Sequence, residues 1–200
     1  MKVVVLDYAV GNVFSIVNAF RRLGADAVLS FKAGVFDSTD TVVFPSVGSY
    51  PAAMSRLEML RSYLDGIMGS KPILGICLGL QLFFEESLEG RAPVRGLGYL
   101  CGRVVPLPPS VKRPHMGWNQ VFNTGSSELL EGVPDGSFFY FAHSFYASTS
   151  GEHVKAFTDY GVRFPSVVEY GGLYGTQFHP EKSGRVGRIV LENFLRIARR

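Results

Sequence analysis

The chain has 200 residues, of which 46% are hydrophobic and 18% are charged. This composition excludes a disordered chain, and the length suits a single domain over residues 1–200 with a substantial hydrophobic core. The formal net charge is only +3 and the basic residues are scattered, so no nucleic-acid partner is expected.

The first apolar run is ended by Asp7, which makes it too short for a secretory signal, and no run approaches membrane-spanning length. We therefore expect a cytoplasmic protein without a membrane partner. Its two cysteines, Cys77 and Cys101, could pair, but reduced thiols are the expectation inside a cell. The sequence has no Cys and His cluster at metal-ligand spacing, so we expect neither a metal nor another cofactor.

The first half of the chain alternates between strand-like and helix-like segments. Residues 2–6 form a continuous β-branched run, as expected for a strand buried on both faces. Apolar residues recur with a helical period over residues 12–23, and Gly24 stops that helix. Further strands are expected at residues 27–31, 41–44 and 73–76, and a helix at residues 51–68. This alternation predicts an α/β fold with a mostly parallel, doubly wound sheet.

The second half contains short strand-like runs separated by Gly, Pro and Ser, which predict an antiparallel extension of the sheet. These runs lie at residues 99–105, 138–147, 153–157, 166–170 and 173–178. Gly171-Gly172 is typical of a hairpin turn. The proline-rich loop at residues 106–114 is expected to be exposed, and an amphipathic helix at residues 185–199 closes the chain.

The most informative motif surrounds Cys77. Gly75 and Gly79 flank this cysteine, an apolar strand-like run precedes it, and a helix-like segment over residues 80–86 follows it. A strand, a sharp turn and a helix form the elbow that presents a nucleophile, and the helix N-terminus favours the reactive thiolate. The alternative is a small buried hydrophobe, but such a cysteine needs neither glycine.

A second candidate motif lies about a hundred residues further on, where Pro180 separates His179 from Glu181. In an extended segment, residues two apart face the same side, so the carboxylate is able to orient the imidazole. Seen alone, the pair also fits a surface His and Glu at a strand end. Together with Cys77, it forms a candidate triad for acyl transfer.

Acyl transfer also needs hydrogen-bond donors for the oxyanion. The backbone N–H of Leu78, directly after the nucleophile, is one candidate. A second lies in residues 45–48, which follow a predicted strand whose carboxyl end shares an edge with Cys77. An ordinary strand-to-helix turn fits residues 45–48 equally well.

The blocks at residues 75–81 (GICLGLQ) and 177–183 (QFHPEKS) resemble the paired signatures of the class I, or triad, glutamine amidotransferases. The resemblance implies their flavodoxin-like fold. Residues 7–12, 45–48, 114–119 (PHMGWN) and 141–145 further resemble the members that serve histidine biosynthesis. The glutaminases of anthranilate synthases share the first two blocks but are less similar at the N-terminus and lack the block at 114–119.

The resemblance implies a Cys77 nucleophile, a His179 acid and base, and Glu181 as its orienting partner. It implies hydrolysis of L-glutamine through a γ-glutamyl thioester. The oxyanion donors would be the backbone N–H groups of Leu78 and Val47. The implied glutamine contacts are Gly48, Gln81, Ser144 and Phe145.

The resemblance also implies a partner, a cyclase or synthase subunit of the (β/α)₈-barrel type that receives the ammonia within a heterodimer. The implied contact residues are Asn12, Trp118, Tyr140 and Lys182. A tryptophan is more often a core anchor, so a buried Trp118 is the alternative at that position.

Two positions depart from the family pattern, because Ser46 and Ala9 stand where the family usually has glycine. A non-glycine residue at 46 restricts the backbone of the segment that would supply an oxyanion donor. We therefore expect low basal activity without the partner. A non-catalytic binding or redox-sensing module is a further alternative, which the complete Cys, His and Glu set disfavours.

Overall fold

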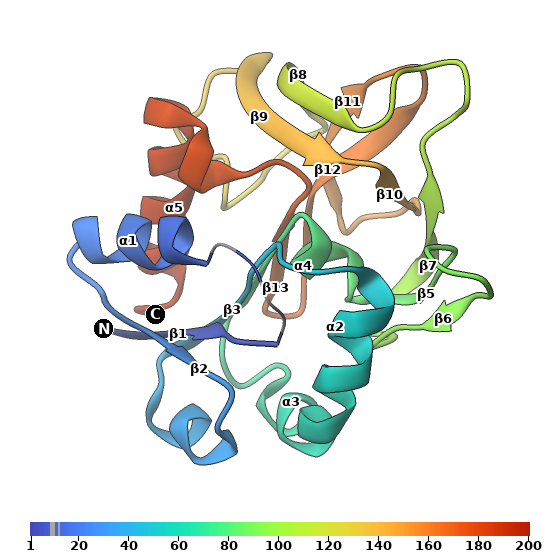
Figure 1. Cartoon of the computed structure of the whole chain (residues 1–200). Coiled ribbons are helices and arrows are strands. Elements are labelled where there is room, and N and C mark those ends of the chain that lie inside the picture. The colour runs from blue at the N-terminus through green and yellow to red at the C-terminus, as the bar shows by residue number, and fades with distance from the viewer. Residues whose placement is uncertain (9–10, 12) are drawn as a thin grey trace.

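A computed structural model describes residues 1–8, 11 and 13–200. It confirms the predicted α/β class, with a nine-stranded sheet in the order β2-β1-β3-β4-β13-β12-β11-β8-β9 (Figure 1). The strands from β2 to β13 are parallel, and the remainder form the antiparallel extension. In that order the strands span Asp26–Ser30, Lys2–Leu6, Thr41–Phe44, Ile73–Ile76, Leu173–Thr176, Arg163–Tyr170, Val154–Asp159, His115–Asn123 and Ser137–His143.

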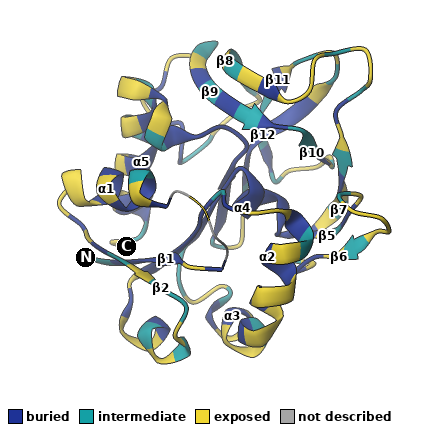
Figure 2. Cartoon of the chain, viewed as in Figure 1, coloured by how far each residue is buried: buried dark blue, intermediate teal, exposed yellow. Residues whose placement is uncertain are grey.

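The parallel strands are covered on both faces, because their alternate side chains enter two different cores. Val3 and Val5 of β1 pack in the core beneath helices α1 (Phe14–Arg22) and α5 (Gly184–Ile197). Val4 and Leu6 pack in the core beneath α2 (Tyr50–Leu57) and α3 (Arg61–Ile67). Figure 2 shows the central strands buried and the outer helix faces exposed. This is the predicted doubly wound arrangement.

A second sheet of four strands, in the order β10-β7-β5-β6, packs beside the elbow. Its strands span Phe145–Ser148, Leu100–Pro106, Phe84–Ser87 and Val94–Arg95. The loop after β7 is exposed at residues 112–114 as expected, but Leu107 in it is buried.

Two helix predictions are wrong in extent. The helix expected over residues 51–68 is divided by a 3₁₀ turn, η2 (Glu58–Leu60), into α2 and α3. Leu57, Leu60 and Leu64 are all buried, so the division keeps one apolar face on the sheet. The helix expected over residues 80–86 is only the short α4 (Leu78–Gln81). The chain then enters β5, because pairing with β7 satisfies the backbone there.

The predicted strand at residues 138–147 is interrupted at Ser144, where the chain leaves β9 in the large sheet and enters β10 in the second sheet. Strand β8 was not predicted, because its polar residues and Gly117 break the alternation of a half-buried strand. Another short 3₁₀ turn, η1 (Ala33–Ser38), follows β2.

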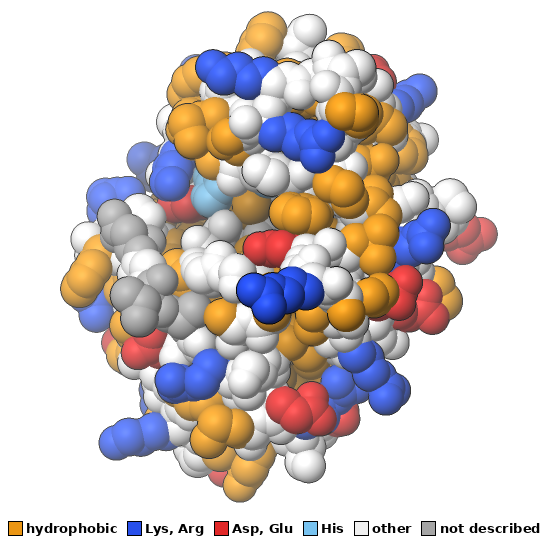
Figure 3. Space-filling view, turned by 45° about the vertical axis from the view of Figure 1, so that its right-hand side comes forward, with side chains coloured by type: hydrophobic (Ala, Val, Ile, Leu, Met, Phe, Trp, Pro, Cys, Tyr) orange, Lys and Arg blue, Asp and Glu red, His pale blue; other side chains and the backbone are white. Residues whose placement is uncertain are grey.

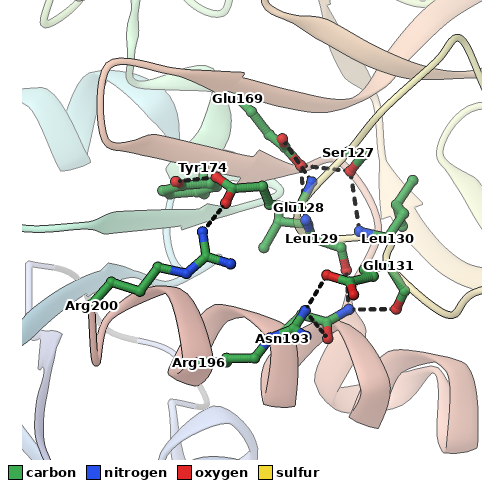
Figure 4. A network of polar contacts seen from close by, with 10 residues as sticks. All are labelled: Ser127, Glu128, Leu129, Leu130, Glu131, Glu169, Tyr174, Asn193, Arg196 and Arg200. Atoms are coloured by element: carbon green, nitrogen blue, oxygen red, sulfur yellow. Dashed lines mark hydrogen bonds and ion pairs between the residues drawn. The ribbon is translucent and has the colours of Figure 1, made fainter.

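A polar network ties the C-terminal helix to the far end of the sheet (Figure 4). The Glu169 carboxylate accepts hydrogen bonds from the Ser127 hydroxyl and from the backbone N–H groups of Glu128 and Leu129. Asn193 of α5 donates to the carbonyls of Leu129 and Glu131, and Arg196 and Arg200 pair with Glu131 and Glu128. The network therefore fixes α5, whose N-terminus lies beside Glu181.

Among the described residues, no helix has the length and apolar character needed to cross a bilayer.

Candidate active site

Cys77 lies at a strained turn between β4 and α4. Its φ is 52° and its ψ is −102°, and it is the only non-glycine residue with positive φ among those described. Backbone strain of this kind concentrates at functional sites. The flanking glycines do not carry this strain but allow close packing of the backbone. A Cβ on Gly79 would lie 2.0 Å from the Phe44 carbonyl oxygen, and one on Gly75 would lie 2.6 Å from the backbone of Gly79. The elbow therefore needs glycine for close packing, whereas the strain falls on the cysteine itself.

Strand pairing brings the two sequence motifs together. β13 runs parallel to β4, and the N–H of Cys77 donates to the Thr176 carbonyl at 2.7 Å. Three residues beyond the end of β13, Nδ1 of His179 lies 2.9 Å from Oε1 of Glu181. Both side chains are buried, although Glu181 lies in a 3₁₀ turn, η3 (Pro180–Lys182), rather than in the extended segment we expected. The structure thus unites all three predicted triad residues.

The electrostatics favour a charged Cys77–His179 pair. Burial raises the pKa of Cys77, but the charge of His179 and hydrogen bonds from His179, the Ser46 hydroxyl and the Leu78 N–H outweigh it, so the pKa is lowered. Burial lowers the pKa of His179, but the charge and hydrogen bond of Cys77 and those of Glu181 outweigh that effect, so the pKa is raised. Both shifts favour a thiolate beside an imidazolium, which is the reactive form.

The candidate oxyanion segment, residues 45–48, follows β3 next to the elbow. The Tyr8 hydroxyl donates to the Pro45 carbonyl, and Val47 is buried. Gly48 has a φ of +76°, a conformation that favours glycine. Ser46, the departure from the family pattern, contributes its hydroxyl to the Cys77 sulfur. The other departure, Ala9, lies outside the described residues.

The predicted glutamine contacts also lie at the elbow. Nε2 of Gln81 donates to the Phe145 carbonyl at 2.7 Å and to Oε1 of Gln177 at 3.1 Å. Nε2 of Gln177 in turn lies 3.5 Å from the Cys77 sulfur. Ser144, at the break between β9 and β10, precedes Phe145 and accepts through its carbonyl from the N–H of Leu107.

Two residues near the site were not singled out by the sequence analysis. Gln177 stands in the same block as His179, and its place two residues before the histidine was the available signal. Glu89 is a half-buried carboxylate that accepts a hydrogen bond from the N–H of Tyr50, two residues after Gly48. Burial raises the pKa of Glu89, and the Tyr50 bond opposes this. No pattern in the sequence marked Glu89.

Three of the predicted partner contacts gather beside the triad. The rings of Trp118 and Tyr140 are 6.2 Å apart, the Lys182 ammonium lies 5.9 Å from the Tyr140 ring, and Tyr140 lies 6.4 Å from the His179 ring. Trp118 is 55% exposed, so the buried-core alternative is wrong. The fourth residue, Asn12, lies outside the described residues.

Trp118 is part of a larger apolar surface on β8 and β9. Its other large members are Met116 and Phe138, both more than half exposed. Figure 3 shows hydrophobic side chains gathered around a hollowed region of the molecule. Exposed apolar patches of this kind mark interaction sites.

Comparison with known proteins defines the class of this fold and site. The family model described as glutamine amidotransferase class-I matches residues 4–198, and the chain belongs to that family. Among solved structures, PurLQS from Thermotoga maritima superposes with a TM-score of 0.77 at 19% identity, covering 98% of both chains. A putative GMP synthase subunit from Thermoplasma acidophilum gives 0.71 at 21% identity, covering 100% of this chain and 94% of that one. These structural matches support the fold.

Curated relatives narrow the class to one branch. A protein from Methanothermobacter thermautotrophicus is 48% identical over 98% of this chain and 99% of its own length. A protein from Archaeoglobus fulgidus is 47% identical over 99% of this chain and 100% of its own length. Both are named imidazole glycerol phosphate synthase subunit HisH, and within the glutamine amidotransferases the chain belongs to this HisH family.

Proposed function

We propose that this chain is the glutaminase subunit of an imidazole glycerol phosphate synthase and hydrolyses L-glutamine to glutamate and ammonia for histidine biosynthesis. The observation that carries the proposal is the buried site in which Cys77, with its lowered pKa, faces a histidine held by Glu181 at 2.9 Å. We further propose that residues 1–200 act as one glutamine amidotransferase domain.

In the proposed reaction, the Cys77 thiolate attacks the carboxamide carbon of glutamine. Backbone N–H groups of Leu78 and Val47 stabilise the oxyanion of the tetrahedral intermediate. The His179 imidazolium donates a proton from Nε2 to the leaving ammonia, and a γ-glutamyl thioester remains. Neutral His179 then takes a proton from water, which attacks the thioester and releases glutamate. Nε2 of His179 suits this role, because it is buried and has no other hydrogen-bond partner among the described residues.

The substrate would be held on both sides of the sulfur. Gly48 and Gln81 contact the bound glutamine, and backbone groups of Ser144 and Phe145 bind its α-carboxylate. Glu89 is the half-buried carboxylate available for the α-ammonium group, since it lies against the segment that follows Gly48.

The ammonia would pass to a cyclase subunit of the (β/α)₈-barrel type. Trp118, Tyr140 and Lys182 are proposed to contact that subunit, together with Asn12. The position of Trp118, Tyr140 and Lys182 beside His179 supports this proposal, because ammonia that leaves at a covered face avoids bulk water.

The test compares glutamine and free ammonium as nitrogen sources in the assembled synthase. Cys77→Ala should abolish glutamine hydrolysis and leave ammonium-dependent synthesis intact. Glutamine hydrolysis near the wild-type rate in this variant would overturn the proposal. His179→Ala should cost more activity than Glu181→Gln, because the base matters more than the group that orients it.

A further inference from the structure

Two buried histidines outside the triad connect β8 to the glutaminase site. His115 on β8 and His143 on β9 face each other in the strand register, with His115 Nδ1 3.0 Å from His143 Nε2. On its other side, His143 Nδ1 lies 2.8 Å from the carbonyl oxygen of Phe145. Neither histidine takes part in the proposed reaction. The pair nevertheless contacts Phe145, a proposed substrate-binding residue, through His143.

The hydrogen-bond partners determine the tautomer of each ring. A carbonyl oxygen only accepts, so His143 must carry its proton on Nδ1 to donate to Phe145. Its Nε2 then accepts from Nδ1–H of His115. Nε2 of His115 accepts in turn from Nδ2 of Asn119 at 3.3 Å, and this Asn119 nitrogen also donates to the Asp159 carbonyl at 3.1 Å. Every donor meets an acceptor only when both histidines are neutral and protonated on Nδ1.

The surroundings support the neutral state. Burial lowers the pKa of His115 to about 4. Burial also lowers the pKa of His143 to about 3, against the opposing effect of the bond to Phe145. The His115 ring is stacked on Tyr160 and Phe141, with centroids 3.9 and 4.9 Å away, which fixes its plane.

A matching set of bonds approaches the same carbonyl from the catalytic side. Gln81 donates to Phe145 at 2.7 Å and also to Oε1 of Gln177, so the amide of Gln177 must turn its Nε2–H groups toward the Cys77 sulfur. Gln177 is fully buried. The carbonyl groups of Phe145 and Asp159 only accept hydrogen bonds. They therefore determine which group donates in each hydrogen bond between β8 and the Cys77 sulfur.

We propose that His143, held in one tautomer by His115, is a positioning residue of the glutaminase site. It fixes the Phe145 carbonyl against which Gln81 is aligned. Gln81 in turn orients the Gln177 amide that donates to the thiolate. The inference rests on the proposed glutaminase function. It connects β8, the strand that carries Trp118, to Cys77 through a continuous series of hydrogen bonds.

The first test measures glutamine hydrolysis by the assembled synthase. His143→Leu should raise KM and lower kcat, reducing kcat/KM about tenfold to a hundredfold, because the Phe145 carbonyl loses a buried donor. His143→Asn should recover most of this loss, since its amide places an N–H near the position of Nδ1. His115→Phe keeps the aromatic stack but removes the donor to His143, and should resemble His143→Leu.

A matched control separates positioning from general loss of stability. Thr158 is buried on β11 and donates to the Gln120 carbonyl, outside the chain of bonds described here. Thr158→Val should lower the melting temperature without changing kcat or KM. The double variant His115→Phe with His143→Leu should be no slower than the worse single variant, since both changes interrupt the same series of hydrogen bonds. Unchanged KM and kcat in both folded single variants would overturn the proposal.

Two further measurements do not depend on glutamine turnover. Long-range proton–nitrogen spectra of the wild-type protein should show both histidines neutral with the proton on Nδ1, and a proton on Nε2 of His143 would overturn the assignment. Alkylation of Cys77 by iodoacetamide at neutral pH should be slower in His143→Leu than in wild type. If wild type lacks glutaminase activity but the alkylation rates differ, the proposed function fails while the positioning role stands. If wild type is active and the variants match it in both assays, only the positioning role fails.

Discussion

At the scale of single residues, the charge state of Cys77 determines whether the elbow holds a nucleophile or an inert thiol. Burial alone would keep the sulfur protonated, and the structure opposes this with three different groups, namely the His179 charge, the Ser46 hydroxyl and the Leu78 N–H. Because these groups converge on one sulfur from separate elements, the thiolate depends on the folded site rather than on the local sequence.

The lowered pKa predicts how alkylation of Cys77 depends on pH. An acid with a lowered pKa stays ionised as the pH falls, so the midpoint of the rate profile should lie below the ordinary thiol value of 9.0. His179→Ala should move the midpoint upward, because burial then acts without the opposing charge. Iodoacetamide rates measured across pH in a Cys101→Ser background check this. A midpoint at or above 9.0 in wild type would contradict the ion pair.

Ser46 is predicted to act in two opposing ways. Its hydroxyl favours the thiolate, whereas its Cβ restricts the backbone that would reorient toward the oxyanion. Ser46→Ala removes only the hydroxyl and should slow alkylation at neutral pH. Ser46→Gly also frees the backbone, so its basal glutaminase rate, measured without the partner, should exceed that of Ser46→Ala. Equal basal rates in the two variants would show that backbone restriction at this position does not limit activity.

At the scale of elements, sequence patterns predicted strands better where burial is complete than where pairing decides. The β-branched runs of β1 and β3 were predicted with correct bounds, since a strand buried on both faces needs no pairing information. β5 and β8 were missed because their own residues do not alternate as a half-buried strand does, and pairing with β7 and β9 makes them strands. The triad could be predicted because its motifs are local, whereas Glu89 and the histidine pair depend on contacts that only the fold creates.

The elbow between β4 and α4 predicts a severe effect of Gly79→Ala. The added Cβ would lie 2.0 Å from the backbone of Phe44, so β3 and the elbow would have to separate. We expect a loss of about 3 kcal/mol in the free energy of unfolding, the upper end of the usual cost of overpacking a core, together with loss of glutaminase activity. Gly66→Ala in α3 is the control, because a Cβ there meets no atom of the described residues within 4 Å, and the variant should be more stable by about 1 kcal/mol. Denaturant unfolding of both variants checks this, and equal stabilities would show that the backbone at the elbow accommodates the added Cβ.

At the scale of the whole molecule, the parallel half supplies the nucleophile and the antiparallel extension supplies the groups around it. Cys77 follows β4, whereas Tyr140, His143 and Phe145 come from β9 and β10. The site therefore lies where the two halves meet, beneath the apolar surface on β8 and β9. The polar network of Figure 4 lies at the other end of the sheet and holds α5 in place, away from the apolar surface beside the triad.

The last prediction concerns this partner face. Trp118 is 55% exposed and its ring packs edge-on against Tyr140, so truncation to alanine removes little buried core and should shift the melting temperature by only a few degrees. Tryptophan is enriched among interface residues whose truncation costs 2 kcal/mol or more, so Trp118→Ala should weaken binding to the proposed cyclase subunit by about thirtyfold. Tyr170→Ala, which truncates another exposed aromatic residue at the opposite end of the sheet, should leave binding unchanged. Binding titrations and thermal unfolding of both variants decide the question. A large drop in melting temperature for Trp118→Ala with unaltered affinity would assign this side chain to packing, because a docking residue acts on the complex and not on the isolated fold.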